Sequence, residues 1–510
     1  MLQHAEAVPQ KTALILGDQR RSYGELGRRT CQLARALRRA GVGAGDTVGA
    51  ALHNGFEWFE LLNAVGLLGA QLVPIGYRLK GPEIAYMLGD SGATVLLAAA
   101  DLATDVDRAA ADLDWPDAAL WVVGEGRWRG RAYEAVLAAE DGAPLADAFP
   151  GGGFNTMIYT SGTTGRPKAI ERQTDPATAH LAMRGMAQMW GLGADDVTLV
   201  AGPCYHTGPA SYAQVHLAIG GTAVIMPRYD AAEALALIER YRVTNAFMVP
   251  THFSRILQLE PPAPGRFDLS SLRLVMHSAA PCPPHVKRGI MQVFPPATVT
   301  EFYGASEGGF TRITAEQWQH KPGSVGTPWP GHEIHILDAD GGALPPGAIG
   351  LIYVRAPRMD FRYRGAEEKT RQAFRDGCFT AGDLGWLDAD GYLFIADRRT
   401  DLIISGGANI YPAEVESALS AHPQIADVAV IGIPDAEMGQ TVLAVVELRR
   451  GAQASADEII AFARRDLAHY KCPRRVELIA ELPREPQGKV RKRDLIARYG
   501  EAAKSVTGDQ

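Results

Sequence analysis

The feature that most restricts the fold is a regular alternation of strand-like and helix-like segments from about residue 45 to residue 300. The strand-like runs are short and apolar, and they include Thr94–Leu97, Thr222–Met226, Thr244–Val249 and Leu272–Met276. Helix-like segments lie between them, such as Ala231–Tyr241, in which apolar residues recur at i,i+3 and i,i+4 spacings. This alternation predicts parallel sheets covered by helices, which is the α/β fold class.

The pattern of predicted secondary structure changes twice after this region. Beyond about residue 320, strand-like pieces at Glu333–Leu337, Ile349–Val354 and Tyr392–Ile395 are separated by Gly, Pro and Asp turns, which predicts a small β-rich layer. From about residue 401 helices return, one with Pro412 at its first position and one opened by a capping box at residues 455–458. We therefore predict two domains, residues 1–399 and 400–510, with the boundary near 398–401; a chain of 510 residues is long enough for this division.

Composition argues against several classes of protein. There are 51 Lys and Arg against 58 Asp and Glu, a formal net charge of −7, which is unlike a general nucleic-acid binder. The N-terminus lacks the pattern of a signal peptide. The longest uncharged run, Leu61–Tyr77, is shorter than the roughly 20 residues that span a bilayer, so we interpret it as a buried helix followed by a buried strand.

The cysteines indicate the compartment. Five of them are scattered without a C-x-x-C pair, so the sequence indicates neither a zinc cage nor a disulfide framework. Scattered thiols in odd number fit a reducing cytoplasm, which is the location we expect.

The segment Tyr159-Thr-Ser-Gly-Thr-Thr-Gly-Arg-Pro-Lys168 is the most informative of the chain. A predicted strand, Phe154–Tyr159, leads into it. Glycines let the backbone approach an anion, hydroxyls add donors and Lys168 adds charge, so the segment predicts a phosphate-binding loop. It is not the G-x-x-x-x-G-K-[ST] loop of the P-loop enzymes, because Gly162 and Gly165 are three residues apart and Pro167 precedes the lysine.

The loop resembles the signature of the adenylate-forming superfamily, which includes acyl- and aryl-CoA synthetases, adenylation domains of peptide synthetases and luciferases. Five further segments match in the same order: Tyr303-Gly-Ala-Ser-Glu307, Phe379-Thr-Ala-Gly-Asp383, Asp397-Arg-Arg-Thr-Asp401, Ser405–Glu414 and Pro483–Lys489. The resemblance covers residues 154 to about 495. It implies a large N-terminal domain of two αβ-layered subdomains and a small β-barrel, followed by a smaller, mobile α+β domain.

The resemblance also assigns the nucleotide site. It implies that Ser161, Thr163, Thr164 and Lys168 grip the β- and γ-phosphates, that Tyr303 lies along adenine and Ser306 near the α-phosphate, and that Asp383 accepts hydrogen bonds from the ribose. Glu307 is the expected Mg²⁺ ligand, with ATP supplying phosphate oxygens. The full expected ATP- and AMP-binding set is Thr160, Ser161, Gly162, Thr163, Thr164, Gly165, Lys168, Ala280, Glu301, Phe302, Tyr303, Gly304, Ser306, Asp383, Ile395, Arg398 and Lys489, with Lys489, Glu307, His206 and Thr164 as catalytic residues.

Lys489 is the chief catalytic candidate. In the family, the equivalent lysine bridges the substrate carboxylate and the α-phosphate, and a mobile ammonium with several donors suits that task. The hinge departs from the family pattern, because Thr400 stands where many relatives have Asp or Lys. Ser405, Gly406 and Gly407 are expected to face the CoA arm after the C-terminal domain rotates.

The acid pocket is expected to be lined by His206, Gly208, Ala210, His252, Met276, His277, Gly304 and Gly308. Small and apolar residues favour an apolar carboxylic acid of appreciable size over acetate. Thr207–Tyr212 contains no Asp for an α-ammonium, which disfavours amino acids. The three histidines lack the short fixed spacing of a zinc site. Aryl, alicyclic, steroid-side-chain and medium-chain fatty acids all remain open.

One local pattern suggests a different enzyme. Gly304-Ala-Ser-Glu-Gly308 fits the G-x-S-x-G nucleophile elbow of hydrolases, but a hydrolase leaves the phosphate loop and Lys489 unexplained. We therefore predict an AMP-forming carboxylic acid–CoA ligase that uses ATP, Mg²⁺ and CoA. The alternatives are an enzyme that loads a carrier-protein thiol and a non-catalytic binding module. No nucleic acid and no transmembrane segment are expected, and a homodimer is expected from base rates.

Overall fold

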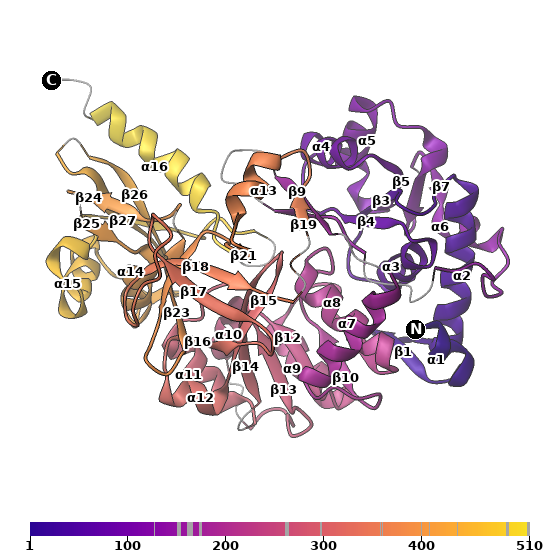
Figure 1. The fold of residues 1–510 in the computed structure, drawn as a ribbon, viewed down its shortest axis with the longest axis horizontal. Helices are drawn as coiled ribbons and strands as arrows, with labels where there is room; N and C mark the ends of the chain where they lie inside the picture. Colours follow the sequence, from indigo (N-terminus) through magenta and orange to yellow (C-terminus); the bar gives the residue numbers. More distant parts are fainter. Residues whose placement is uncertain are drawn as a thin grey trace. The chain divides into compact units, whose positions relative to one another are not determined.

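The computed structural model describes all of the chain apart from residues 127, 150–154, 161–166, 173–175, 261–264, 296–297, 358, 360, 399, 407, 436, 486–488 and 507–510. It divides into two units (Figure 1). Unit 1 contains residues 1–248, 258–276 and 360–370, and unit 2 contains residues 249–257, 277–359 and 371–510.

Parallel sheets form the centre of unit 1, as the alternating pattern predicts. In one sheet the strand order is β2-β1-β11-β10-β12, and every pairing except β1 with β2 is parallel. The strands are β1 (Thr12–Leu16), β2 (Gln19–Ser22), β10 (Val197–Val200), β11 (Thr222–Ile225) and β12 (Asn245–Met248). The second sheet is wholly parallel, in the order β4-β3-β5-β6-β7. Its strands are β3 (Thr47–Ala51), β4 (Gln71–Pro74), β5 (Ala93–Ala99), β6 (Leu120–Val123) and β7 (Arg131–Ala132).

The helices of unit 1 cover these sheets (Figure 1). They are α1 (Leu2–Ala7), α2 (Tyr23–Arg39), α3 (Phe56–Leu68), α4 (Gly81–Ser91), α5 (Ala103–Asp112), α6 (Tyr133–Ala138), α7 (Pro176–Met189), α8 (Thr207–Ile219) and α9 (Ala231–Tyr241). Helix α9 has the predicted bounds. The run at Leu61–Tyr77 forms the end of α3 and strand β4, and α3 is buried along almost its whole length. Among the described residues, none of the helices combines the length and apolarity that crossing a bilayer requires.

A three-stranded antiparallel sheet, β19-β9-β8, completes unit 1. It consists of β8 (Ile158–Thr160), β9 (Lys168–Arg172) and β19 (Phe361–Tyr363). Strand β13 (Leu274–His277) lies at the boundary of the units, and so does α13 (Glu367–Ala373).

Unit 2 begins with helices and a hairpin and continues as an antiparallel layer. Its first elements are α10 (Pro250–Leu257), α11 (Pro284–Val293), the hairpin strands β14 (Val299–Ala305) and β15 (Gly308–Thr314), and α12 (Ala315–His320). The layer has the order β14-β15-β16-β23-β22-β18-β21-β20, with β17 on β18. Its strands are β16 (Ser324–Pro328), β17 (Glu333–Leu337), β18 (Gly350–Arg355), β20 (Phe374–Arg375), β21 (Cys378–Phe379), β22 (Asp383–Leu387) and β23 (Leu393–Arg398). The β-rich texture predicted beyond residue 320 is thus confirmed.

The last part of unit 2 is a sheet with helices, ordered β25-β24-β27-β26 with β28 beside β27. Its strands are β24 (Ile403–Ser405), β25 (Ala408–Ile410), β26 (Ile425–Asp435), β27 (Gly439–Leu448) and β28 (Arg475–Ile479); its helices are α14 (Pro412–Ser420), α15 (Ala456–Asp466) and α16 (Lys492–Val506). Pro412 opens α14, and Ser455 and Glu458 form the predicted capping box of α15. Ile459 and Ala463 are the buried residues of α15, and Ile460 is partly buried beside them.

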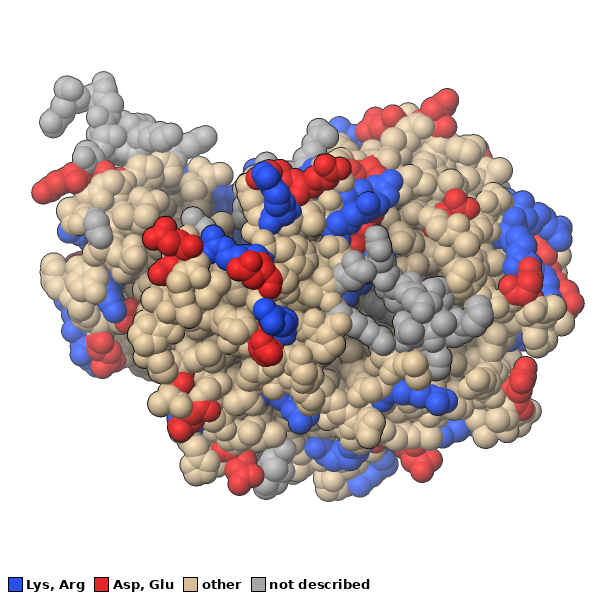
Figure 2. Space-filling model, in the orientation of Figure 1, with Lys and Arg blue, Asp and Glu red and all other residues tan. Residues whose placement is uncertain are grey.

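Charges are mixed on the surface. On the face drawn in Figure 2, lysine and arginine side chains are interspersed with aspartate and glutamate. This accords with a formal net charge of only −7 over 510 residues.

Candidate active site

The hairpin of β14 and β15 carries the residues expected to meet adenine and the α-phosphate. A side chain at Gly304 is excluded, because its Cβ would lie 2.5 Å from the carbonyl oxygen of Gly308. Ser306 and Glu307 form the turn between the two antiparallel strands. A nucleophile elbow needs a strand that runs into a helix. The strand–turn–strand geometry around Ser306 therefore removes the hydrolase alternative.

A chain of polar contacts joins three of the predicted residues. The hydroxyl of Tyr303 donates to Oδ2 of Asp383 at 2.7 Å, and Nε of Arg398 lies 3.2 Å from Oδ1 of the same carboxylate. Asp383 and Arg398 face each other in the register of β22 and β23, which explains why residues 15 positions apart in sequence meet. Burial, followed by the charge of Asp383, raises the pKa of Tyr303 well above its usual value. The phenol therefore stays protonated and acts as a donor.

Lys489 shares its electrostatic environment with this chain. Burial lowers its pKa, and the positive charge of Arg398 lowers it further, while Glu485, Asp401 and Asp383 oppose the shift. The carbonyl oxygen of Lys489 accepts from the N–H of Glu485 at 2.7 Å. The structure thus brings Tyr303, Asp383 and Arg398 into contact in unit 2, and Lys489 lies within range of the charges of Arg398 and Asp383.

The predicted phosphate loop connects two antiparallel strands. Ser161, Gly162, Thr163, Thr164 and Gly165 lie outside the described residues. The residues on either side, Thr160 and Lys168, pair across β8 and β9. Tyr159 donates to Asp90 at 2.7 Å, and Tyr86 donates to the carbonyl of Pro167 at 2.8 Å. These bonds anchor both ends of the loop to α4.

The expected Mg²⁺ ligand is a single buried carboxylate. Glu307 is 9% exposed. The described residues contain no group of three or more His, Cys, Asp or Glu side chains arranged to hold a metal ion.

Two of the predicted acid-pocket residues of unit 1, His206 and Ala210, line a narrow pocket at the start of α8. It is lined by Trp58, Leu62, Pro74, Thr156, Ile158, Cys204, Tyr205, His206, Thr207 and Ala210. Burial lowers the pKa of His206 to about 3, and its Nε2 has no hydrogen-bond partner among the described residues. Gly208 cannot carry a side chain, because a Cβ would lie 2.6 Å from the ring of Phe247. His206 is therefore a neutral imidazole with one nitrogen free to contact a ligand.

Met276 and the remaining histidines lie at the ends of buried elements. Met276 is buried in β13. Nδ1 of His252 accepts from the N–H of Val249 at 3.4 Å, and burial lowers the pKa of His252 to about 3. Within the part of the chain that the structure describes, neither ring nitrogen of His277 has a hydrogen-bond partner, and its Nε2 lies 3.7 Å from Glu301.

Glu301 belongs to a buried ion pair. Nζ of Lys287 donates to it at 2.5 Å and lies 4.8 Å from the centre of the Trp318 ring. Burial raises the pKa of Glu301, and Lys287 opposes that shift. The Glu301 carboxylate is thus engaged by Lys287, which links β14 to α11.

The other predicted residues are spread over unit 2. Ala280 follows the turn residue Ala279, and Ile395 pairs with Gly385. Phe302 lies one residue before Tyr303, with its ring 6.0 Å from that of Trp329. The remaining predicted positions lie at the start of the C-terminal part. The hydroxyl of Thr400 donates to the carboxylate of Asp401 at 3.2 Å, and Ser405 pairs with Gly439. The N–H of Gly406 donates to the carbonyl of Met438 at 2.8 Å, and Gly407 lies outside the described residues.

The sequence reasoning missed two residues that this geometry makes prominent, Lys287 and Asp397. Lys287 is fully buried on the inner face of α11. A lysine among the apolar positions of an amphipathic helix was the available signal for it. Asp397 lies within a motif recognised in the sequence, but no residue near it in the sequence indicated that it would bond to Ala413 in α14.

Comparisons with known proteins identify the class. The family model described as AMP-binding enzyme matches residues 1–363, and the AMP-binding enzyme C-terminal domain model matches residues 414–489. The chain belongs to the AMP-binding enzyme family. The adenylate-forming class, the enzyme assignment and the fold predicted from the motifs are confirmed.

Individual relatives cover nearly the whole chain. A feruloyl-CoA synthase of an Amycolatopsis species is 34% identical over 509 residues, covering 98% of each chain. A fatty acid–[acyl-carrier-protein] ligase, ScoC of Streptomyces coeruleorubidus, is 31% identical over 515 residues, covering 99% of this chain and 96% of that protein. The crystal structure of the anthranilate CoA ligase AuaEII with anthranoyl-AMP matches with a TM-score of 0.87 at 28% identity, covering 98% of this chain and 96% of that one.

Proposed function

We propose that the protein is an AMP-forming carboxylic acid–CoA ligase for an apolar aromatic or fatty acid. The observation that carries the proposal is the cluster of Tyr303, Asp383, Arg398 and Lys489 in a member of the AMP-binding enzyme family. These side chains offer donors, a carboxylate and two cations at one place, as a nucleotide and a second anion require.

In the first step a carboxylate oxygen of the acid attacks the α-phosphorus of ATP, a new O–P bond forms and pyrophosphate leaves. Two anions must approach each other, so positioned positive charge lowers the barrier. In this proposal Lys489 bridges the two anions, Arg398 and Asp383 hold the ribose end, and the hydroxyl loop with Lys168 orients the leaving pyrophosphate. Bound at Glu307 and the phosphates, Mg²⁺ would neutralise charge on the leaving group.

In the second step the thiol of CoA attacks the acyl carbon and AMP leaves. We propose that residues 400–510 form a mobile domain, pivoting near Thr400, that removes Lys489 and presents Ser405, Gly406 and Gly407 to the CoA arm. The separate family models for residues 1–363 and 414–489 support this division. A hinge requires only a backbone that tolerates a change of φ and ψ.

The acid is proposed to be apolar because the residues around His206 are small or apolar and His206 itself is neutral. The named relatives include enzymes for ferulate, indoleacetate, succinylbenzoate and long-chain fatty acids. One relative, ScoC, is named for loading an acyl-carrier protein, so a carrier thiol is the second candidate acceptor. Five free cysteines support the expected cytoplasmic location.

The test offers purified protein ATP, Mg²⁺ and a panel containing a hydroxycinnamic acid, an indole acid, a medium-chain fatty acid, acetate and an amino acid. Pyrophosphate and AMP report the first step, and mass spectrometry of CoA thioester reports the second. We expect kcat/KM for the best apolar acid to exceed that for acetate by at least about 100-fold. The proposal is overturned if no acid yields AMP. Adenylation followed by loading of a phosphopantetheinylated carrier, with CoA left unused, would select the second candidate.

A further inference from the structure

Asp397, the second-to-last residue of β23, caps a helix that begins well after it in the sequence. Its side chain is buried, and its Oδ2 accepts from the backbone N–H of Ala413 at 2.8 Å. Its other oxygen accepts from the N–H of Arg398 at 2.7 Å. Ala413 is the second residue of α14, where backbone N–H groups have no partner within the helix.

The start of α14 has no cap of its own. The residue before the helix, Tyr411, makes no side-chain capping bond, and Pro412 has no N–H to donate. A carboxylate facing the positive end of a helix forms a charge-assisted hydrogen bond. Asp397 therefore supplies, from strand β23, the capping acceptor that a serine or aspartate directly before the helix usually provides.

A turn at the end of β23 leads into β24 and β25, which precede α14 in the chain. The N–H of Asp401 donates to the carbonyl of Arg398 at 3.0 Å, and this turn includes Thr400, the proposed hinge. The hydrogen bond from Ala413 to Asp397 links α14 to β23 directly, in addition to the chain that connects them. Any rotation at residues 398–401 that carries α14 away from β23 must break it.

A second contact joins α14 to Lys492, a near neighbour of Lys489 in the sequence. Nζ of Lys492, at the first position of α16, lies 2.8 Å from Glu416 of α14. Asp397 and Asp401 add negative charge around the same ammonium. Lys489 precedes Lys492 by only three residues. Its position beside Arg398 is thus tied to β23 through α14.

We propose that Asp397 is a positioning residue whose carboxylate latches α14 to β23 and so holds Lys489 beside Arg398 and Asp383 for adenylation. The proposal rests on the proposed function and goes beyond it. It assigns to the hydrogen bond of Asp397 the task of keeping Lys489 in place for adenylation. When the hydrogen bond between Ala413 and Asp397 breaks, α14 is released for the thioester-forming step. A variant that lacks this bond is therefore slowed only in adenylation.

The experiment uses the full chain with Asp397→Ala and measures the two half-reactions separately. Removal of a helix cap of this strength should lower the rate of acid-dependent pyrophosphate release roughly tenfold. Thioester formation from supplied acyl-adenylate and CoA should stay within about twofold of the unmodified enzyme or rise. Asp397→Asn keeps one acceptor oxygen and should give a smaller loss in the first step.

Ser455→Ala is the matched control. It removes a side-chain helix cap of the same type from α15, where Ser455 accepts from Glu458 at 3.2 Å, without touching β23. It should leave the ratio of the two half-reactions unchanged. An equal fall of both half-reactions in Asp397→Ala, or no fall in either, would overturn the latch.

Hydrogen–deuterium exchange gives a readout independent of activity. Asp397→Ala should increase exchange at the start of α14 and in the peptide around Lys489 and Lys492, and Ser455→Ala should not. Unchanged exchange around Lys489 would also overturn the proposal, even in a preparation that adenylates no acid. Failure of the proposed function itself would show differently, as absence of AMP from the unmodified chain with every acid.

Discussion

The phenolic hydroxyl of Tyr303 holds Oδ2 of Asp383 at 2.7 Å while Arg398 approaches the other oxygen of that carboxylate. Tyr303→Phe keeps the ring and removes this bond, so Asp383 loses one of the groups that orient it. We expect KM for ATP to rise about 5- to 10-fold, as for a lost hydrogen bond to a charged group, with little change in KM for the acid. Steady-state kinetics with each substrate varied in turn measures this. Tyr241→Phe, which removes a 2.7 Å bond to the carbonyl of Gly17, is the control; an unchanged KM for ATP in Tyr303→Phe would contradict the interpretation.

Lys489→Ala should separate the two half-reactions. Loss of one positioned donor at a developing charge costs about 100- to 1000-fold in rate, so adenylation should fall at least that far while thioester formation from supplied acyl-adenylate suffers much less. Burial and Arg398 lower the pKa of Lys489, so adenylation by the unmodified enzyme should begin to decline with rising pH before the ordinary lysine pKa of about 10.4 is reached. Rapid-quench measurement of both steps checks the variant, and equal losses in both would refute the assigned role.

Ala279 has a backbone conformation that suits glycine. Its φ is +76°, in the turn that follows β13 and precedes Ala280. Left-handed backbone costs an L-residue about 1–2 kcal/mol, whereas glycine adopts it freely and loses part of the gain through its more flexible unfolded state. Ala279→Gly should therefore raise the free energy of unfolding by about 0.5–1 kcal/mol, measured by urea denaturation. Ala461→Gly, in the interior of α15, should lower it by a similar amount; stabilisation by both or by neither would argue against strain at Ala279.

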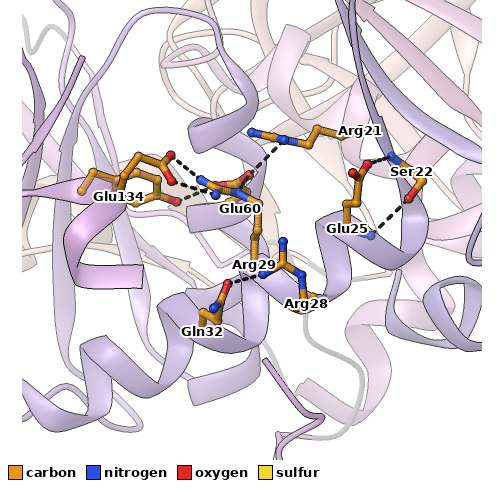
Figure 3. A network of polar contacts seen from close by, with 9 residues as sticks. Arg21, Ser22, Glu25, Arg28, Arg29, Gln32, Glu60 and Glu134 are labelled. Atoms are coloured by element: carbon orange, nitrogen blue, oxygen red, sulfur yellow. Dashed lines mark hydrogen bonds and ion pairs between the residues drawn. The ribbon is translucent and has the colours of Figure 1, made fainter. Parts of the chain in front are cut away.

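A buried ion network ties α2, α3 and α6 together in unit 1 (Figure 3). Arg29 bonds Glu60 at 2.6 Å on one side and Glu134 at 2.6 Å on the other, and Tyr133 also donates to Glu60 at 2.6 Å. The side chain of Glu60 is fully buried, but that of Glu134 is 66% exposed. Glu60→Gln should cost on the order of 3 kcal/mol because it leaves buried charge on Arg29 less compensated. Glu134→Gln should cost less than about 1 kcal/mol because water replaces its contact. Equal losses in the two urea titrations would contradict this ranking.

Buried histidines should make the fold sensitive to mild acid. Burial lowers the pKa of His252 to about 3 and that of His216 to about 4, against about 6.5 in an unfolded chain. Between pH 6.5 and 4 the unfolded chain binds protons that the folded chain does not, so stability present above pH 6.5 is lost as pH falls. Each such histidine contributes up to about 1.4 kcal/mol per pH unit. His216→Gln should flatten the decline measured by urea denaturation at pH 7.5 and 5.5, and the exposed His469→Gln should not; identical slopes for all three proteins would contradict the prediction.

Local signals predicted much of this molecule. Helix α9 and strand β17 have the predicted bounds, and Pro412 and Ser455 open helices as their residue types suggest. The grouping of Tyr303, Asp383, Arg398 and Lys489 could be anticipated because each lies in a segment that resembles a motif of the adenylate-forming superfamily. What could not be predicted are partners distant in sequence. Nothing local connects Asp397 with Ala413, Lys287 with Glu301 or Arg29 with Glu60, because tertiary packing alone brings such pairs together.

The pairing of Asp383 with Arg398 also limits how the gene can change. The two residues are directly opposite on β22 and β23, and side chains alternate between the faces of a strand. The register of the two strands already shifts between Leu384 and Gly385, and a further codon added or deleted beside this bulge would move Asp383 and Arg398 out of register. Insertions between these residues should be tolerated best around Asp388–Gly391, where the chain reverses between β22 and β23, but even there they would disturb the ion pairs of Asp388 and Asp390 with Lys321.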